Sequence, residues 1–371
     1  MGWREAFFRT TSPGLILGIT LGDLVCLLAE NGFRVRPRYW PKAAFAALIS
    51  LISTPVRQME DAVYGQRVAQ QSVLPPLFII GHWRSGTTHL HNLISVDRRF
   101  AYARFCQVMI PHTFLIGERL MEAGSAVLLP AERLGLDNVA MNPQVPWEEE
   151  FALCLATFLS PYMTWAFPHR ADHYDRYLTF RGVPATEVER WKEAFVTLLK
   201  KLTWKYHLPL VLKSPPNTGR IKLILEMFPD ARFVHIHRDP YVVYQSTRHL
   251  HLKSWEYNSL QLPDPSVVRR RVIRQYTSMF DAFFEEKSLI PAGRFCEVAY
   301  TQLDGDPVGE LRRIYDELAL PDFGVVEPAV KDYVQTLTTY EKNTHIELPA
   351  DVRSEIGDTW RRSFEEWKYL L

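Results

Sequence analysis

The sequence predicts an α/β protein in which a central parallel sheet is flanked by helices in three layers, with a helical segment in front of it. Short apolar and β-branched runs alternate with longer helical patterns, and the loops after three of these runs carry anion-binding residue types. We expect strands at 77–81, 208–214, 232–238 and 294–300. Ligands of such sheets bind at the carboxyl ends of the strands, so these loops are where the chemistry is expected.

The composition is that of a folded protein without a global charge. Of the 371 residues 47% are hydrophobic and 23% are charged, which is enough apolar material for a large core. Lys and Arg number 43 and Asp and Glu number 42, giving a formal net charge of +1. This balance disfavours a nucleic-acid partner, so any anionic ligand must be held by a local cluster.

The cysteines predict neither a disulfide framework nor a metal site. Cys26, Cys106, Cys154 and Cys296 lie far apart, with no Cys-x-x-Cys or Cys/His spacing. A reducing compartment fits best, and we expect a cytoplasmic protein that needs no metal.

Polar residues and two prolines at 70–76 separate an apolar N-terminal segment from the rest, which predicts a helical segment 1–72 and a main domain 73–371. Within the segment the apolar stretches 14–29 and 43–56 are shorter than the roughly 20 residues of a membrane span. No small-x-small cleavage site follows the first of them, so a signal peptide is not expected. The segment either lies on a membrane surface or packs as a helical cap over the acceptor cavity.

The loop after the first expected strand has the layout of a phosphate-binding turn. Gly81 and Gly86 let the backbone turn closely around an anion, Thr87 and Thr88 supply hydroxyl donors, and a helix start follows. The cation is Arg84, inside the loop, and Gly86 is followed by Thr rather than by Lys. The missing Gly-Lys-[Ser/Thr] disfavours a magnesium-dependent nucleotide kinase, which is the first alternative function.

The run Arg84-Ser85-Gly86-Thr87-Thr88 resembles the 5′-phosphosulfate loop of the sulfotransferase superfamily, a basic residue followed by Ser-Gly-Thr-Thr. The resemblance covers about residues 75–371 and is to a bacterial branch related to the tyrosylprotein and cytosolic sulfotransferases. It implies a P-loop-like fold and 3′-phosphoadenosine 5′-phosphosulfate as the co-substrate. It also implies that these five residues bind the phosphosulfate, with Arg84 neutralising charge as it develops.

A second candidate site follows the strand expected at 232–238. Asp239 suits a helix N-cap and Pro240 the first helical position, while Arg238 offers a planar fork to a phosphate. Alone, this pattern is more often a capped helix with a surface ion pair. An Arg at a strand end followed eight residues later by Ser246 resembles the 3′-phosphate site of the superfamily.

Lys213 stands where the strand expected at 208–214 ends, and Pro215 and Pro216 stiffen the exit. A lone lysine at a strand end is usually a solvated charge. Here the surrounding segment resembles the one that carries the catalytic lysine of tyrosylprotein sulfotransferases, which implies that Lys213 stabilises the leaving group.

The expected general base is a carboxylate of the triplet Glu148-Glu149-Glu150, placed in the first turn of an apolar helix. Acids there also serve simply to complement the helix dipole. The bacterial branch has a similar Pro-x-Glu-[Asp/Glu]-Glu stretch, so Glu148 and Glu150 rank above Glu149.

Histidines are the rival base, because cytosolic sulfotransferases use one. His82, His89, His91 and His112 lie near the first loop in sequence, and each is more often a structural hydrogen-bonding group than a catalyst. We keep His82 as the strongest alternative.

The polar stretch at 339–348 is similar to a Tyr-x-Lys-Asn-x-His stretch that closes over the nucleotide in the bacterial branch. The similarity implies that Lys342 and Asn343 contact the nucleotide. The alternative is a surface loop.

Together these patterns predict a sulfotransferase that moves a sulfuryl group by in-line displacement to the hydroxyl of a small apolar acceptor, such as a sterol, lipid or phenol. Aromatic residues at 157–168 either line the acceptor pocket or belong to the core. A non-catalytic, membrane-associated nucleotide-binding protein is the second alternative function. The acceptor and the oligomeric state stay open.

Overall fold

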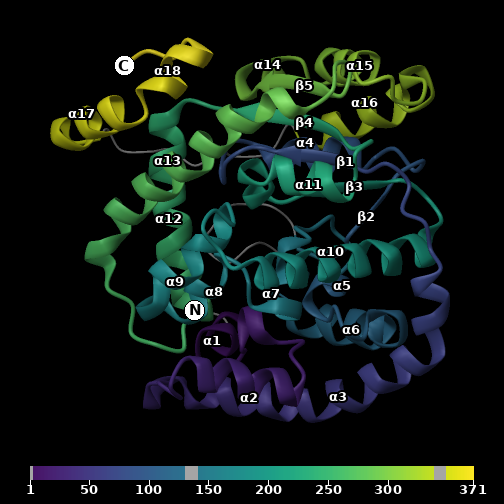
Figure 1. Ribbon diagram of the computed structural model, residues 1–371, viewed down its shortest axis with the longest axis vertical. Coiled ribbons are helices and arrows are strands. Elements are labelled where there is room, and N and C mark those ends of the chain that lie inside the picture. Colours follow the sequence, from purple (N-terminus) through teal and green to yellow (C-terminus); the bar gives the residue numbers. More distant parts are fainter. Residues whose placement is uncertain (1–2, 130–140, 338–347) are drawn as a thin grey trace. The chain divides into compact units, whose positions relative to one another are not determined.

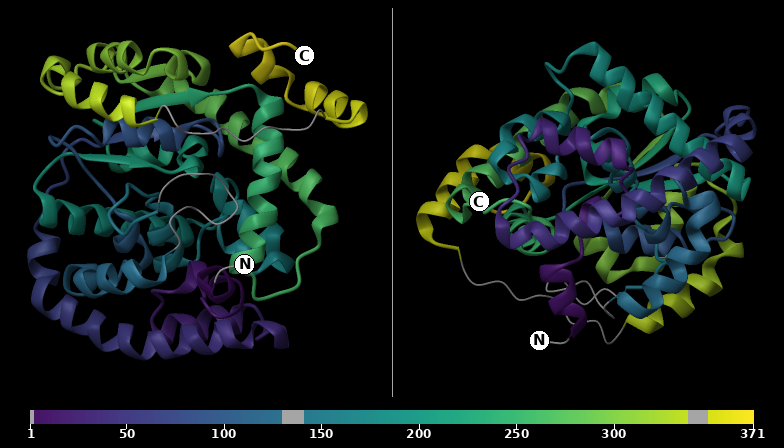
Figure 2. Two further views of the ribbon diagram at one scale, coloured as in Figure 1. Left: turned by 180° about the vertical axis from the view of Figure 1, so that it is seen from behind. Right: turned by 90° about the horizontal axis from the view of Figure 1, so that it is seen from below.

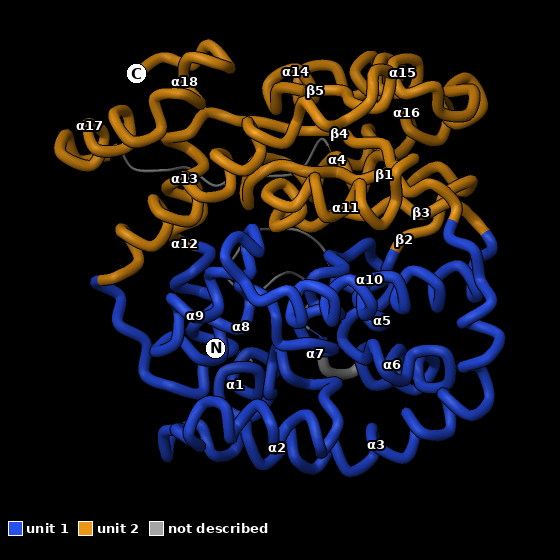
Figure 3. The backbone as a smooth tube through the Cα atoms, viewed as in Figure 1, with its two compact units in different colours: residues 1–73, 103–207, 250–266 blue, residues 74–102, 208–249, 267–371 orange. Residues whose placement is uncertain are grey.

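The computed structural model describes residues 3–129, 141–337 and 348–371 (Figure 1). The chain forms two compact units, drawn in two colours in Figure 3. Unit 1 consists of residues 1–73, 103–207 and 250–266, and unit 2 of residues 74–102, 208–249 and 267–371.

Unit 2 is built on a parallel five-stranded sheet with the order β2-β3-β1-β4-β5. In register, Phe78 of the central strand lies between Leu212 and Phe233. The four strands expected from the sequence are confirmed, while β2 was missed because a two-residue strand carries no periodic signal. The strands are β1 (Leu77–Ile80), β2 (Ala101–Tyr102), β3 (Leu210–Lys213), β4 (Arg232–His237) and β5 (Phe295–Ala299).

Helices cover both faces of this sheet (Figure 1). Ile79, Val234 and Ile236 point into a core shared with the helices that follow β1 and β5. On the other face Phe78 stacks on Phe233, and His235 stacks on Phe283. The first face carries α4 (Thr87–Ile94), α14 (Tyr300–Gly305), α15 (Pro307–Glu317) and α16 (Glu327–Thr336); the second carries α11 (Ile221–Met227) and α13 (Val268–Glu286). The predicted three-layer α/β class is therefore confirmed.

The other helices of the second half of the chain are α12 (Pro240–Asn258), α17 (Ala350–Thr359) and α18 (Arg361–Trp367). Helix α12 begins at the predicted Pro240, and Asp239 accepts a hydrogen bond from the backbone N–H of Tyr241. The C-terminal helices are held by stacked rings, Trp360 on Tyr276 and Trp367 on His237.

The regular elements of unit 1 among its described residues are helices, joined by turns and loops. Its longest helix is α3, and α2 packs along it (Figures 1 and 2). No helix among the described residues is long and apolar enough to cross a bilayer. The helices are α1 (Trp3–Thr10), α2 (Leu21–Glu30), α3 (Trp40–Ala69), α5 (Phe105–Met109), α6 (Phe114–Leu128), α7 (Glu150–Thr157), α8 (Met163–Ala166), α9 (Ala171–Asp175) and α10 (Ala185–Tyr206).

Candidate active site

The loop between β1 and α4 is shaped by two glycines with positive φ. Gly81 has φ +146° and Gly86 has φ +105°. A Cβ on Gly81 would lie 2.4 Å from the carbonyl oxygen of Ile236, and a Cβ on Gly86 would lie 2.4 Å from the ring of Tyr300. Any side chain at either position would therefore displace its neighbours. The Gly81 N–H donates to Thr218 Oγ1 at 2.7 Å, which ties the loop to the segment after β3.

Hydrogen bonds join the predicted site residues of unit 2 to one another. Arg84 Nε donates to Ser246 Oγ at 2.8 Å, and Arg238 Nη1 donates to the Arg84 carbonyl oxygen at 3.4 Å. Lys213 Nζ donates to Thr88 Oγ1, also at 3.4 Å. The side chains expected to bind the two ends of one nucleotide thus meet around a single loop.

Ser85 and Thr87 complete this loop from within. The Ser85 hydroxyl donates to the His82 carbonyl at 2.8 Å and is buried, so it holds the turn together. Thr87 is the first residue of α4, whose N-cap is Gly86. The amide groups of this helix start carry partial positive charge, which suits an anion.

Arg238 packs against the Tyr300 ring and lies near the charges of Arg84, Asp239 and Asp304. Its guanidinium carbon lies 4.1 Å from the centroid of the Tyr300 ring. Burial, and next the charge of Arg84, lower the pKa of Arg238, while Tyr300 opposes that shift. Tyr300 was missed by the sequence analysis, although it directly follows β5 and so stands at the carboxyl end of a strand.

Lys213 is the last residue of β3 and is almost fully buried. Burial, and then the positive charge of Lys213, hold the pKa of His91 well below its usual range. The lysine therefore has a neutral imidazole as a neighbour. It reaches the phosphate-type loop through Thr88, as described above.

This donor set fits a bound phosphosulfate nucleotide. The groups that meet are guanidinium, ammonium, hydroxyl and backbone N–H groups, and the loop 81–88 contains no carboxylate. A dianion would find charge-assisted donors at Arg84 and Arg238. The glycines of the loop at 81–86 are packed against Ile236 and Tyr300, which fixes the turn in which these donors meet.

One group of possible metal ligands exists among the described residues, in unit 1. Cys106, Glu118 and Glu122 lie with ligand atoms within 4.8 Å of one another. Burial raises the pKa of the Cys106 thiol to about 12, and Glu118 accepts a hydrogen bond from Gln107 and is paired with Lys205. Two of the possible ligand groups are thus a protonated thiol and a carboxylate that already has protein partners.

The acidic triplet belongs to unit 1, and its helix begins later than expected. Helix α7 begins at Glu150, with Glu149 as its N-cap, so Glu148 lies before the helix. The prediction that all three acids lie in the first helical turn is therefore wrong. Before the helix, residues 142–145 form a turn, and Pro146 pairs with Arg104 as an isolated antiparallel bridge, so the helix cannot begin earlier than Trp147.

The three acids differ in burial and partners. Glu149 and Glu150 are fully buried, and Glu150 Oε1 accepts a hydrogen bond from Ser160 Oγ at 2.6 Å. Glu148 is half-buried, and its Oε2 accepts a hydrogen bond from the phenol of Tyr162. Of the two carboxylates ranked first, only Glu148 combines partial exposure with a fixed orientation.

Aromatic rings pack around Tyr162, the hydrogen-bond partner of Glu148. Tyr162 stacks on Trp165 with centroids 4.4 Å apart and planes 12° apart. Phe151 meets Tyr162 edge-on at 5.1 Å and Trp147 at 5.9 Å. The sequence analysis did not identify Tyr162 as the hydrogen-bond partner of Glu148, because only the fold brings position 162 to position 148.

His82, the rival base, lies in an apolar setting in unit 2. Its Nδ1 is 3.0 Å from the Trp83 carbonyl oxygen, and its ring packs against Tyr276 and Phe280. Burial lowers the pKa of His82 to about 4. Its Nε2 has no hydrogen-bond partner among the described residues. The imidazole is therefore neutral and enclosed by rings.

The predicted contacts Lys342 and Asn343 lie outside the described residues.

The layered parallel sheet, with a phosphate-type loop after its first strand and cations after its third and fourth, defines a group-transfer enzyme of the P-loop-like class. The chain matches the Sulfotransferase family over residues 75–324 and belongs to it. It is thus a transferase of the sulfotransferase class, as the sequence predicted.

Two curated relatives match almost the whole chain. It is 33% identical over 367 residues to the omega-hydroxy-beta-dihydromenaquinone-9 sulfotransferase Stf3 of Mycobacterium bovis, covering 99% of this chain and 94% of the relative. The relative of the same name from Mycobacterium tuberculosis gives the same figures.

Two solved structures share the fold. Sulfotransferase STF9 from Mycobacterium avium matches with a TM-score of 0.67 and 17% identity, covering 95% of this chain and 98% of that chain. Sulfotransferase STF1 from Mycobacterium tuberculosis H37Rv matches with a TM-score of 0.63 and 17% identity, covering 92% and 90%.

Proposed function

We propose that this sulfotransferase moves a sulfuryl group from 3′-phosphoadenosine 5′-phosphosulfate to the terminal hydroxyl of a long, isoprenoid-type lipid. The donor assignment rests on two hydrogen bonds of Arg84: its Nε donates to Ser246 Oγ, and its carbonyl oxygen accepts from Arg238 Nη1. The second of these bonds joins two anion-binding elements that are 154 residues apart in sequence.

In this proposal the donor is held at both of its anionic ends. The loop amides, including that of Ser85, the Thr87 and Thr88 hydroxyls and Arg84 take the 5′-phosphosulfate, while Arg238 and Ser246 take the 3′-phosphate. The carbonyl contact to Arg84 and the Tyr300 ring hold the Arg238 guanidinium in place, so a phosphate finds an oriented fork.

The bound donor supplies a sulfuryl group on a stable phosphate leaving group. Lys213 stabilises the negative charge that develops on the phosphate oxygen as the sulfur–oxygen bond breaks, because it is buried at the end of β3 and directed to Thr88. Arg84 shares this charge. No metal is required for these roles.

Glu148 removes the proton of the acceptor hydroxyl in this proposal. The Tyr162 hydrogen bond fixes one carboxylate oxygen, and partial exposure leaves the group accessible to an acceptor. Glu150 is a weaker candidate because it is fully buried and held by Ser160. His82 is weaker because its ring is enclosed and its pKa lies at about 4.

The acceptor class rests on the curated relatives. They are named for a menaquinone carrying an ω-hydroxyl, which is a long apolar chain ending in a hydroxyl group. The stacked Tyr162 and Trp165 rings are buried, so they support the position of Glu148 and do not argue for a particular acceptor. The sterol and phenol alternatives are retained as competing acceptors in the test.

The test is transfer of radiolabelled sulfur from the phosphosulfate donor. We expect label on a hydroxyl-terminated isoprenoid and none on the same isoprenoid lacking the hydroxyl group, without added metal. Sterol and phenol acceptors run in parallel decide between acceptor classes. Turnover of ATP with magnesium but not of the labelled donor would overturn the donor assignment in favour of the kinase alternative.

A further inference from the structure

Helix α3 buries polar side chains and exposes large apolar ones. Among its buried residues are four polar or charged ones, Lys42, Ser50, Ser53 and Glu60. Its exposed side instead carries large apolar side chains, most of them more than half exposed. These are Trp40, Leu48, Leu51, Ile52, Met59 and Val63. A surface helix of a water-exposed domain normally shows the opposite pattern.

The buried polar groups on this helix hold it in that orientation. Lys42 Nζ donates to the Tyr257 carbonyl oxygen, and Ser50 Oγ donates to the Ala47 carbonyl oxygen at 2.7 Å. Glu60 accepts a hydrogen bond from the Ile116 N–H at 3.0 Å and pairs with Lys201 at 2.5 Å. Rotating α3 would take Glu60 away from Lys201, and the largely buried Lys201 would lose its ion pair, which is costly.

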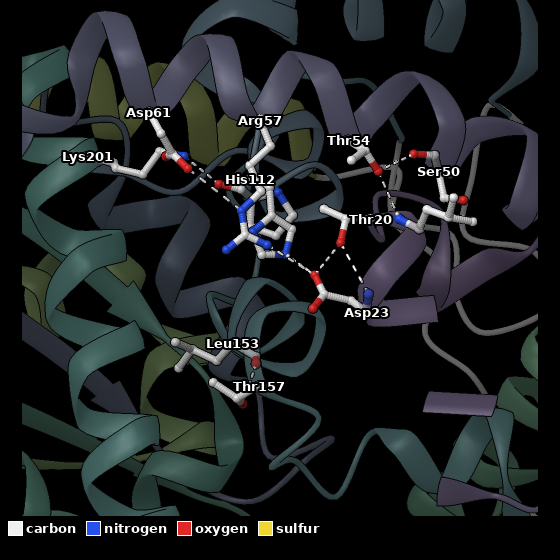
Figure 4. A network of polar contacts seen from close by, with 12 residues as sticks. Thr20, Asp23, Ser50, Thr54, Arg57, Asp61, His112, Leu153, Thr157 and Lys201 are labelled. Carbon is white, nitrogen blue, oxygen red and sulfur yellow. Dashed lines mark hydrogen bonds and ion pairs between the residues drawn. The ribbon is translucent and has the colours of Figure 1, made fainter. Parts of the chain in front are cut away.

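Further polar contacts fix the helix on α2 (Figure 4). Arg57 Nη1 donates to Asp23 Oδ2 at 3.1 Å, and His112 approaches the same carboxylate. Asp23 also accepts a hydrogen bond from the Thr20 hydroxyl at 2.6 Å. The polar contacts of its inner face hold α3 in this orientation, and its large apolar residues are therefore exposed.

The exposed apolar residues form one stripe. Positions 48, 51, 52, 59 and 63 follow the three- and four-residue spacing of a single helix face. Exposed Phe33 lies in the connection from α2 to α3, and Val25 of α2 is half exposed. A contiguous apolar patch of this kind marks an interaction surface.

The charges next to the stripe indicate which class of partner it binds. Arg34, Arg36 and Arg38 are exposed and lie between the exposed rings of Phe33 and Trp40. The sequence from 31 to 59 contains no Asp or Glu, and exposed Glu30 and Asp61 lie at its two ends. Aromatic rings and arginines beside an apolar face are typical of a helix lying in the interface of an anionic bilayer. A second copy of the chain would bring only these two carboxylates to three arginines, and Asp61 already pairs with Arg57.

We propose that the outer face of α3, with the arginine turn before it, binds the surface of an anionic lipid bilayer. The helix lies in the plane of the interface, with Leu48, Leu51 and Ile52 in the acyl boundary and the arginines at the lipid phosphates. The proposal is independent of the donor and acceptor assigned above, because vesicle binding is measured without either.

The first experiment is co-sedimentation of the full chain with vesicles of phosphatidylcholine alone or mixed with phosphatidylglycerol. We expect tight, salt-sensitive binding to the mixed vesicles and weak binding to the neutral ones. Replacing the turn by R34Q/R36Q/R38Q is expected to weaken binding to the mixed vesicles by about a hundredfold, at roughly fivefold per arginine. Equal binding of wild type to both vesicles, or none, overturns the proposal.

The second experiment separates the stripe from general hydrophobicity. The variant L48Q/L51Q/I52Q is expected to weaken vesicle binding at least about a hundredfold. The matched control L262Q/L289Q/V325Q changes three exposed apolar residues elsewhere and should bind like wild type. All six positions are exposed, so both variants should unfold at the wild-type denaturant concentration.

Two outcomes of this comparison contradict the proposal. One is an equal loss of binding in the control variant. The other is a wild-type dimer in sedimentation equilibrium that L48Q/L51Q/I52Q dissociates, with no vesicle binding, which would make the stripe a self-association surface. Sulfur transfer to a short, water-soluble hydroxyl acceptor should persist in L48Q/L51Q/I52Q, so a failure of membrane binding is distinguishable from a failure of the proposed reaction.

Discussion

The basic cluster of unit 2 and the carboxylate cluster of unit 1 are built on different principles. Arg84, Lys213 and Arg238 stand on or beside strand ends, and their positions follow from backbone geometry. Glu148 stands before a helix, and its position follows from packing of Tyr162 and its ring neighbours. The residues of the anion-binding site can therefore be recognised from short sequence motifs. The carboxylate site cannot, because it depends on side chains that are distant in sequence. The predictions below test that contrast.

The largest expected effect is that of Lys213→Ala. Because its ammonium is assigned to charge that develops only in the transition state, kcat should fall roughly 10³-fold. Titration calorimetry should find the Kd for adenosine 3′,5′-bisphosphate changed by less than about threefold. Lys222→Ala, at an exposed lysine on α11, is the control and should keep wild-type kcat. Equal losses in kcat and nucleotide affinity would make Lys213 a binding residue instead.

Glu148→Gln should lower kcat by at least about 10²-fold, because the amide cannot accept the acceptor proton. Steady-state kinetics should show a smaller loss, about tenfold, for Tyr162→Phe, which frees the carboxylate that Tyr162 orients. Glu150→Gln is the matched comparison and should affect the denaturation midpoint more than kcat. If His82→Phe abolished turnover while Glu148→Gln did not, the assignment of the base would be reversed.

Arg238→Gln should weaken binding of adenosine 3′,5′-bisphosphate by about 30-fold, as expected for loss of a charge-assisted phosphate contact worth about 2 kcal/mol. Ser246→Ala should weaken it by about fivefold to tenfold. Calorimetry with adenosine 5′-phosphate, which lacks the 3′-phosphate, provides the control, because neither variant should alter that affinity much. An unchanged affinity for the bisphosphate would remove both residues from the donor site.

The smallest effect concerns stability against acid. The folded pKa of His82 is about 4 against an ordinary value of 6.5, so only the unfolded chain gains a proton as the pH falls through 6.5. The group therefore costs stability progressively between pH 6.5 and about 4, by roughly 1 kcal/mol near pH 5.5. Urea denaturation should show a flatter pH profile for His82→Phe, and an identical slope would show that this histidine is protonated when folded.

The sequence predicted the parts of the fold that repeat locally. Four of the five strands, the helix start at Pro240 and the loop at 81–88 follow from β-branched runs, capping residues and glycine spacing. The two-residue strand β2 has no such pattern. It exists because its neighbours in the sheet extend it, as in the bond from the Ala101 N–H to the Pro209 carbonyl oxygen.

The contacts that sequence analysis missed are long-range. Tyr300 reaches Arg238 only because β5 lies beside β4, and Tyr162 reaches Glu148 only through the turn between α7 and α8. The orientation of α3 was missed for a related reason. Hydrophobic periodicity predicts apolar residues inside, but the buried partner Lys201 makes Glu60 the inward residue.

The hydrogen bond between Arg84 and Ser246 has a consequence for the speed and cost of ligand capture. A hydroxyl that accepts from a guanidinium still has its own hydrogen to donate, so the pair does not need to separate before an anion approaches. This hydrogen bond already orients both side chains. Less rotational freedom is then lost on binding, so the entropic cost of binding the nucleotide is smaller and the affinity is higher.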